Sequence, residues 1–247
     1  MYTLLLVSGP PAGGRLWDDV VERLRHHGQP VEVVELFRPV PSDPTVPGLA
    51  ETIRARVDHI DGPVILVAHG TAVPVAWAAA TKAQLAGLVL TNGPIASLDP
   101  FLRTFCTFAR TPRVLASTLL QPRLLQRWLA SSAGLRRTVV NPYVMDHDMV
   151  VAVSEAYLDS PEARLAVAHF LRDLPRAVAN PPSIETPTLL LWGDEDRLYP
   201  PSTIDKIRHL LASNTHERIS GGQHHHPAER PWEIADRLAA WNPETVS

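Results

Sequence analysis

The sequence has little of what marks several classes of protein. Its single cysteine, Cys106, excludes an internal disulfide and any metal site built from several thiolates. Lysine occurs only as Lys82 and Lys206, and the net charge is −3 with acidic and basic residues interleaved. A chain without a basic patch is not expected to bind nucleic acid or an anionic membrane.

Long hydrophobic runs are also missing. The apolar stretch from Met1 to Val7 is too short to span a bilayer and has no positive residues before it, so it predicts a strand and not a signal peptide. We therefore expect a cytoplasmic protein whose partner is a small hydrophobic molecule. A chain of 247 residues, 45% of them hydrophobic, is long enough for one well-buried domain. Its oligomeric state is left open.

Short apolar runs rich in β-branched residues alternate with helical patterns, which is typical of βαβ units. The runs predict an α/β fold with a mainly parallel sheet of about six strands and flanking helices. The predicted strands are residues 3–7, 31–36, 64–67, 87–91, 188–192 and 217–219, and the predicted helices between them include 49–57, 72–80 and 232–241. In the last helix, Trp232, Ile234, Leu238 and Trp241 are expected to pack together on the sheet.

The segment from 95 to 184 breaks this alternation. It contains five helical stretches and no convincing strand, with proline and serine between them. We interpret it as a helical lid over the carboxyl ends of the strands, where α/β folds bind ligands. The predicted core is then 1–94 and 185–247, with the lid at 95–184. Trp128, Tyr143, Met145 and His147 could contact substrate, but we interpret them as packing or surface residues of this lid.

Three motifs that carry chemistry each follow a predicted strand. The first, Val67-Ala68-His69-Gly70-Thr71-Ala72, runs directly into an alanine-rich helix. The second is Trp192-Gly193-Asp194-Glu195-Asp196, and the third is Gly222-Gln223-His224-His225-His226. An imidazole paired with a carboxylate is suited to proton transfer near neutral pH, because the carboxylate holds the ring in one tautomer.

The strand-turn-helix at Gly70 resembles the nucleophile elbow of the α/β-hydrolase superfamily, whose form is G-x-S-x-G. In this resemblance Gly70 stands at the serine position, and Ala68 and Ala72 replace the two glycines. Glycine accepts the strained backbone of an elbow at little cost, so the turn can survive without its side chain. Thr71 is an alternative nucleophile, although the resemblance implies that it gives its backbone N–H to the oxyanion hole while its side chain points aside.

The same resemblance places the catalytic acid at Asp196 and the catalytic histidine at His224, with His225 as the alternative base. Asp194 and Glu195 are interpreted as solvated turn residues. The loop Ser8-Gly9-Pro10 takes the place of the family's oxyanion loop, so Gly9, Pro10, Gly70 and Thr71 are expected to bind substrate. Ser8 is expected to line the pocket or to bond the loop.

A metal site at the three consecutive histidines is the competing interpretation. Adjacent residues of an extended loop point in different directions, and no His-x-x-x-His motif or cysteine lies nearby. We therefore expect neither a metal nor another cofactor.

A histidine and an aspartate without a nucleophile indicate chemistry other than covalent ester hydrolysis. We expect a lyase that eliminates a carboxylate, and the chain resembles hydrolase-fold tailoring enzymes of bacterial secondary metabolism that eliminate acetate from acylated tetronate polyketides. Three alternatives stay open: a cyclase, a hydrolase in which His224 activates water, and a catalytically inactive protein that binds a small molecule or a partner.

Overall fold

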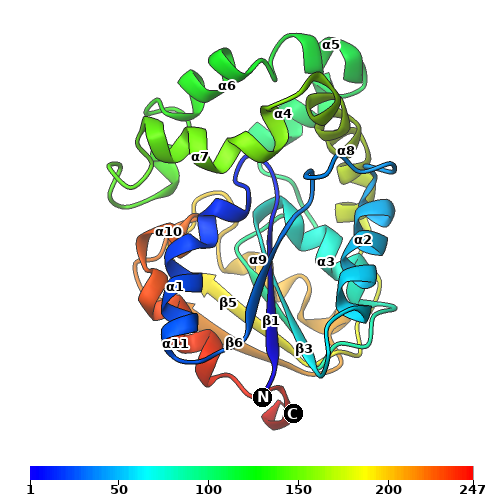
Figure 1. The fold of residues 1–247 in the computed structure, drawn as a ribbon, viewed down its shortest axis with the longest axis vertical. Helices are drawn as coiled ribbons and strands as arrows, with labels where there is room; N and C mark the ends of the chain where they lie inside the picture. The colour runs from blue at the N-terminus through cyan, green and yellow to red at the C-terminus, as the bar shows by residue number, and fades with distance from the viewer. Residues whose placement is uncertain (247) are drawn as a thin grey trace.

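The computed structural model describes residues 1–246, which form a single parallel sheet with helices on both faces (Figure 1). The strands of the sheet are β1 (Thr3–Ser8), β2 (Val31–Glu35), β3 (Val64–His69), β4 (Gly87–Thr91), β5 (Thr188–Gly193) and β6 (Asn214–Ile219). Their order is β2-β1-β3-β4-β5-β6, and every neighbouring pair is parallel. The predicted α/β class and sheet are confirmed.

Helices cover the two faces of the sheet because side chains alternate along each strand. Leu4 and Leu6 pack with α1 (Asp18–His26) and α11 (Pro231–Ala240), whereas Leu5 and Val7 face the larger cluster that contains α2 (Val46–Asp58) and α3 (Val73–Ala80). The remaining short helices of this part of the chain are α9 (Ser202–Asp205), α10 (His226–Glu229), η1 (Gly14–Trp17), η2 (Gly70–Ala72), η4 (Arg208–Leu210) and η5 (Pro243–Thr245).

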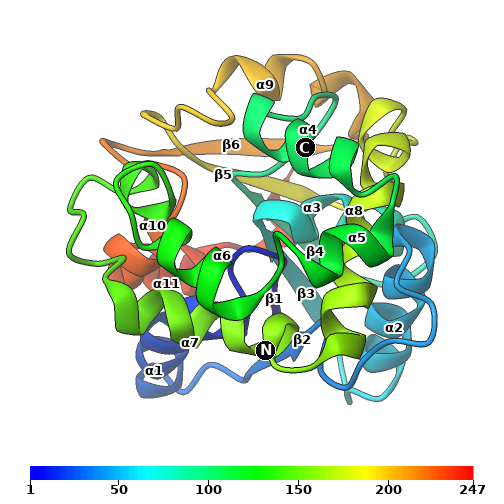
Figure 2. The same ribbon diagram turned by 90° about the horizontal axis from the view of Figure 1, so that it is seen from above.

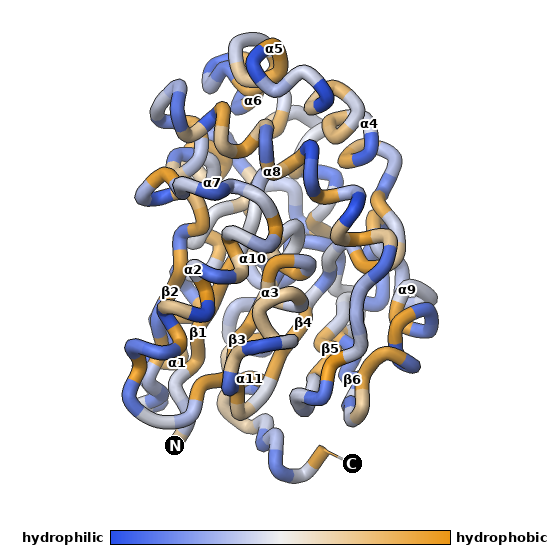
Figure 3. The backbone as a smooth tube through the Cα atoms, turned by 90° about the vertical axis from the view of Figure 1, so that its right-hand side faces the viewer, coloured by the Kyte–Doolittle hydropathy of each residue, from blue (hydrophilic) through white to orange (hydrophobic). Residues whose placement is uncertain are grey.

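Between β4 and β5 the chain is helical, as predicted for residues 95–184. The elements of this helical segment are α4 (Pro100–Phe108), α5 (Pro112–Ser117), α6 (Pro122–Leu129), η3 (Leu135–Thr138), α7 (His147–Leu158) and α8 (Pro161–Ala179). Figures 1 and 2 show α4 to α7 lying over the carboxyl ends of the strands, with α8 running down beside the sheet. Hydrophobic and hydrophilic residues alternate along these helices (Figure 3), as expected for elements with one buried and one exposed side.

The strand register brings the ends of the central strands together. Ser8 is opposite His69, and His69 is opposite Thr91, so β1, β3 and β4 end side by side. Gly193 is opposite Ile219, which aligns the ends of β5 and β6 in the same way. The loops that follow these five strands therefore meet at one edge of the sheet.

One helix prediction needs correction. Trp232 does not pack on the sheet: it is 67% exposed, and the guanidinium of Arg23 lies 5.7 Å from the centre of its ring. Ile234 and Leu238 are buried, as expected. Trp232 lies in the first turn of α11 on an exposed side of the helix, whereas Ile234, Ala235 and Leu238 form its buried side.

Candidate active site

The turn after β3 has the geometry of a sharp strand-to-helix elbow. Gly70 takes a φ of +59°, a region that residues with a side chain rarely enter, and its N–H donates to the carbonyl oxygen of Asn92 at 3.0 Å. A Cβ built on Gly70 would meet only Nε2 of His224, at 3.9 Å. The space beside this nitrogen is thus bounded by backbone and not by a side chain.

His224 and Asp196 form a buried pair, as the motifs predict. Nδ1 of His224 lies 2.9 Å from Oδ2 of Asp196, and the two residues are 6% and 2% exposed. The second carboxylate oxygen accepts the backbone N–H groups of Leu198 at 2.7 Å and Tyr199 at 3.1 Å. Every oxygen of Asp196 is therefore bonded, and the ring of His224 is fixed with Nε2 facing Gly70.

The pKa of Asp196 reflects opposing effects. Burial acts to raise it, but the charge of a protonated His224, its hydrogen bond and the bond from Asn92 act to lower it, and the net pKa lies below the usual value. Asp196 is consequently ionised at neutral pH. An ionised carboxylate at Nδ1 stabilises the imidazolium that forms whenever His224 takes up a proton.

Asn92 is a positioning residue that the motifs do not contain. Its side-chain N–H₂ donates to Oδ2 of Asp196 at 2.5 Å, while its Oδ1 accepts the backbone N–H of Gly193 and the ring N–H of His226, both at 2.9 Å. With its bond to Gly70, this residue links the loops after β3, β5 and β6. Its place directly after the predicted strand 87–91 is the signal available in the sequence, and in the structure it takes a positive φ of 21°.

The predicted oxyanion residues fall into two groups. Thr71 lies in the cavity wall with Gly9, and its hydroxyl donates to the carbonyl oxygen of Pro10 at 2.6 Å, so its side chain points away from His224 as expected. A Cβ on Gly9 would lie only 2.7 Å from the backbone nitrogen of Ala72, which explains why a glycine stands there. Ser8 is buried without a hydrogen-bond partner for its Oγ and lies outside the cavity wall, contrary to both expectations.

The histidine loop departs from the sequence interpretation in two ways. His224 and His225 do not point apart: their ring centroids are 4.7 Å from each other, and both approach the ring of His69, because the chain turns into α10 directly after His225. Asp194 is also not merely a solvated turn residue. Its Oδ1 accepts the backbone N–H of Gly221 at 2.6 Å and so connects the aspartate loop to the histidine loop.

A cavity of about 60 Å³, here called the chamber, lies between His224 and the helical segment. Its wall includes Gly9, Gly70 and Thr71 from the sheet edge, and Trp128 and Arg137 from the helices. Trp128 is not only a packing residue of the helical segment: its ring stacks on Phe101 at 4.6 Å, and both residues line the chamber. Tyr143 is 78% exposed and Met145 is fully buried, in keeping with surface and packing roles.

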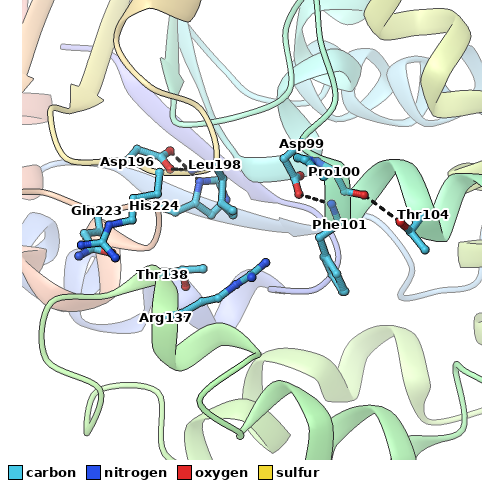
Figure 4. Close-up of a pocket in the computed structure, with 11 residues that line it drawn as sticks. Asp99, Pro100, Phe101, Thr104, Arg137, Thr138, Asp196, Leu198, Gln223 and His224 are labelled. Atoms are coloured by element: carbon cyan, nitrogen blue, oxygen red, sulfur yellow. Dashed lines mark hydrogen bonds and ion pairs between the residues drawn. The ribbon is translucent and has the colours of Figure 1, made fainter.

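Two further spaces adjoin the chamber. An open vestibule of about 590 Å³ shares His224, Arg137 and Leu198 with it, and Figure 4 shows Arg137 and Thr138 across this vestibule from Asp196 and His224. An apolar pouch of about 40 Å³ beneath α4 and α6 shares Phe101 and Leu129 with the chamber. A ligand at His224 would have a polar opening on one side and a hydrophobic wall on the other.

The sequence matches the alpha/beta hydrolase family over residues 4–237, so the chain belongs to this family. No curated relative matches it by sequence. None of the helices in residues 1–246 is long and apolar enough to cross a membrane.

Solved structures support the fold assignment. A thermophilic esterase from Thermogutta terrifontis is similar with a TM-score of 0.70 and 19% identity, over 100% of this chain and 91% of the esterase. The haloalkane dehalogenase DbeA from Bradyrhizobium elkani has a TM-score of 0.74 and 17% identity, with 98% and 90% covered. The Cif epoxide hydrolase from Acinetobacter nosocomialis has a TM-score of 0.74 and 13% identity, with 96% and 81% covered. At these identities the likeness concerns the fold alone.

Proposed function

We propose that this protein is a non-hydrolytic member of the alpha/beta hydrolase family that uses His224 and Asp196 to transfer protons in an elimination reaction. The observation that carries the proposal is the pairing of an anchored imidazole with a glycine. Nε2 of His224 faces Gly70, where the elbow offers it no side chain, while Nδ1 is bonded to Asp196.

Covalent acyl transfer requires a hydroxyl or thiol that the imidazole can deprotonate. Within residues 1–246, no serine, threonine or cysteine side chain is hydrogen-bonded to His224. Thr71 is the nearest candidate in sequence, and its hydroxyl is already engaged with Pro10. These contacts argue against Thr71 as a shifted nucleophile and leave Nε2 free to act on the substrate itself.

In the proposed reaction, Nε2 removes a proton from a carbon next to a carbonyl group. The electron pair of the C–H bond forms an enolate, whose oxygen accepts hydrogen bonds from the backbone N–H groups of Gly9 and Thr71. The enolate then forms a carbon–carbon double bond as the C–O bond at the β-carbon breaks, and the carboxylate departs with that bonding pair. The proton held by His224 returns to solvent.

The wall of the chamber supports an acylated hydrophobic substrate. Phe101, Trp128 and Leu129 offer apolar contacts, whereas Arg137 is the one lysine or arginine among the lining residues. Its guanidinium, 5.8 Å from the centre of the Phe101 ring, can pair with a departing carboxylate such as acetate. An acylated polyketide of bacterial secondary metabolism has both features and is the substrate class that we favour.

The test uses β-acetoxy ketones and β-acetoxy lactones with apolar tails, followed by proton NMR in D₂O. We expect the wild-type protein to release acetate and the alkene, and His224→Ala to lose about 10²- to 10⁴-fold in rate. Gly70→Ser provides the matched gain of function, because the new hydroxyl would point toward Nε2. This variant should hydrolyse p-nitrophenyl acetate faster than the wild type does.

Each alternative predicts a different result. Solvent ¹⁸O in the released acid and an alcohol in place of the alkene would indicate a hydrolase that activates water. Full activity of His224→Ala on a cyclising substrate would indicate a cyclase that only folds its substrate. Tight binding without turnover across the whole series would indicate an inactive binding protein. Any of these three results would overturn the proposed elimination.

A further inference from the structure

Three imidazoles from two parts of the chain meet beside Gly70. His69 is the last residue of β3, and His224 and His225 lie in the loop after β6. One ring nitrogen of each lies within 4.8 Å of the corresponding nitrogen of the other two, and the residues are between 1% and 6% exposed. His26, His27 and the other histidines of the chain do not take part in this cluster.

The outward-facing nitrogen of each ring is held by an oxygen. Nδ1 of His224 is bonded to Asp196 at 2.9 Å, Nδ1 of His69 to the hydroxyl of Thr91 at 2.8 Å, and Nδ1 of His225 to the hydroxyl of Thr138 at 2.6 Å. Histidines that bind metals are commonly oriented in this way, with the second ring nitrogen bonded to a carboxylate or another oxygen. The three Nε2 atoms are the ones left for a common ligand.

The tautomers of two rings can be assigned from these bonds. Asp196 is ionised and only accepts, so Nδ1 of His224 carries the hydrogen and Nε2 has a lone pair. The hydroxyl of Thr138 donates to the carbonyl oxygen of Leu135, so it must accept from Nδ1 of His225, which again leaves a lone pair on Nε2. Both rings therefore have a lone pair on Nε2 that is available to a ligand.

His69 makes the arrangement hard to explain as ordinary packing. Its Nε2 is buried and has no hydrogen-bond partner, and burying such a group without compensation costs about 1–3 kcal/mol. A metal ion bound between the three rings would give this nitrogen a partner.

We propose that Nε2 of His69, His224 and His225 bind one divalent transition-metal ion of the zinc class, with the fourth coordination position open toward the chamber at Gly70. Three imidazoles and one open position suit zinc, cobalt and nickel, whereas magnesium and calcium prefer oxygen ligands. Gly70 is compatible with this arrangement, because even a Cβ built there would lie 3.9 Å from Nε2 of His224. His225 has no part in the proposed elimination, and in this site it is a metal ligand.

Binding of the ion would also regulate the proposed function, on which this part of the inference rests. The lone pair of Nε2 of His224 cannot accept a proton from substrate while it is bound to a metal. Metal loading should therefore suppress elimination, and removal of the metal by a chelator should restore it.

The experiment uses the full chain without an affinity tag, freed of metal with EDTA and then dialysed. Cobalt(II) chloride serves as the probe, followed by visible absorption, and zinc chloride is titrated by calorimetry. We expect one ion per chain with the intense visible bands of four-coordinate cobalt. His69→Gln and His225→Gln should weaken binding by ~100-fold or more, and Thr138→Val by ~10-fold or more, since it removes the bond that orients His225. The matched control is His209→Gln, on an exposed histidine outside the cluster, which should bind as the wild type does.

A second measurement does not depend on any variant folding. X-ray absorption at the zinc edge of the loaded wild-type protein should show three imidazole nitrogens at about 2.0–2.1 Å. Fewer than three imidazoles, no stoichiometric binding, or wild-type binding by folded His69→Gln and His225→Gln would overturn the proposed site. Metal binding with undiminished elimination would overturn the regulatory part alone. If no form of the protein eliminates carboxylate while the metal still binds, the proposed function fails and the metal site stands.

Discussion

The loops at the edge of the sheet and the helices above them contribute to the site in different ways. At the sheet edge, Asp196, Asn92 and His224 each make hydrogen bonds that fix their orientation. The helical segment instead supplies the stacked rings of Phe101 and Trp128, and it is bonded to the sheet side of the chamber through Thr138, which binds both the backbone and the ring of His225. The groups proposed to react are therefore held by the core, whereas the helices set the shape of the space proposed for substrate.

The largest effect should follow from breaking the sheet side at Asp196→Asn. The neutral amide can no longer stabilise an imidazolium and can bond His224 in the wrong tautomer, so we expect kcat for elimination to fall by about 10³- to 10⁴-fold. Steady-state kinetics with the acetoxy ketone series would measure this loss. Glu195→Gln, at the exposed carboxylate next to Asp196 in sequence, is the control and should keep most of the activity.

Acid should destabilise the folded protein through the buried histidines at the edge of the sheet. Burial lowers the pKa of His69 and His225, and it lowers that of His226 to about 3. In the unfolded chain these histidines take up protons at about pH 6.5, whereas in the folded chain they stay neutral to a lower pH. Their contribution to the free energy of unfolding is therefore fully present above pH 6.5 and decreases as the pH falls toward the folded pKa values. Between pH 6.5 and pH 5, each such histidine should lower the free energy of unfolding by up to about 2 kcal/mol.

Urea unfolding with EDTA present, at pH 7.5 and pH 5.0, would measure this loss. The lowered pKa of Asp196 acts in the same direction only below its ordinary value of 3.8, so it contributes nothing in this window. A urea midpoint that does not change between the two pH values would contradict the buried, neutral histidines.

A smaller effect is expected when the helical side is changed at Arg137→Gln. The guanidinium would pair with a charge that develops only as the carboxylate departs, so its loss should lower kcat by about 10-fold and change KM less, in line with the loss of one charge-assisted hydrogen bond. Comparison of an acetate ester with a neutral leaving group isolates the effect. Equal losses on both substrates would show that Arg137 does not recognise the carboxylate. Arg103→Gln, on α4, is a control whose arginine lies outside the chamber wall.

The smallest effect should come from Trp232→Ala on α11. The ring is 67% exposed, and its contact with Arg23 is the interaction that remains to be lost, so we expect the free energy of unfolding to change by no more than about 1 kcal/mol. Thermal and urea unfolding would test this. Ile234→Ala on the same helix, with a fully buried side chain, should cost about 2–5 kcal/mol.

The sequence predicts the sheet and most helices because hydrophobic periodicity and proline spacing are local signals. Gly70, Asp196 and His224 are found for the same reason, since each lies in a short motif after a strand. The partners Asn92, Thr138 and His69 are not, because strand order and the turn after His225 bring them together from distant parts of the chain. The predictions for Trp232 and Ser8 were wrong because each depended on the direction of a single side chain, which the sequence pattern does not determine.

The chemical stability of the site also depends on the rigidity of the turn that contains Asn92. It precedes Gly93, and an asparagine before a glycine loses its amide readily when the glycine nitrogen can swing onto the side-chain carbonyl. Deamidation would place a second carboxylate against Asp196, where two negative charges cannot both be held without raising one pKa. Asn92 is fully buried, and its side-chain nitrogen and oxygen and its backbone carbonyl are all hydrogen-bonded. A Cβ on Gly93 would lie 2.5 Å from the carbonyl oxygen of Gly70. We expect this tight turn to protect the folded protein from chemical ageing, and mass spectrometry of incubated samples should find the lesion first in partly unfolded molecules.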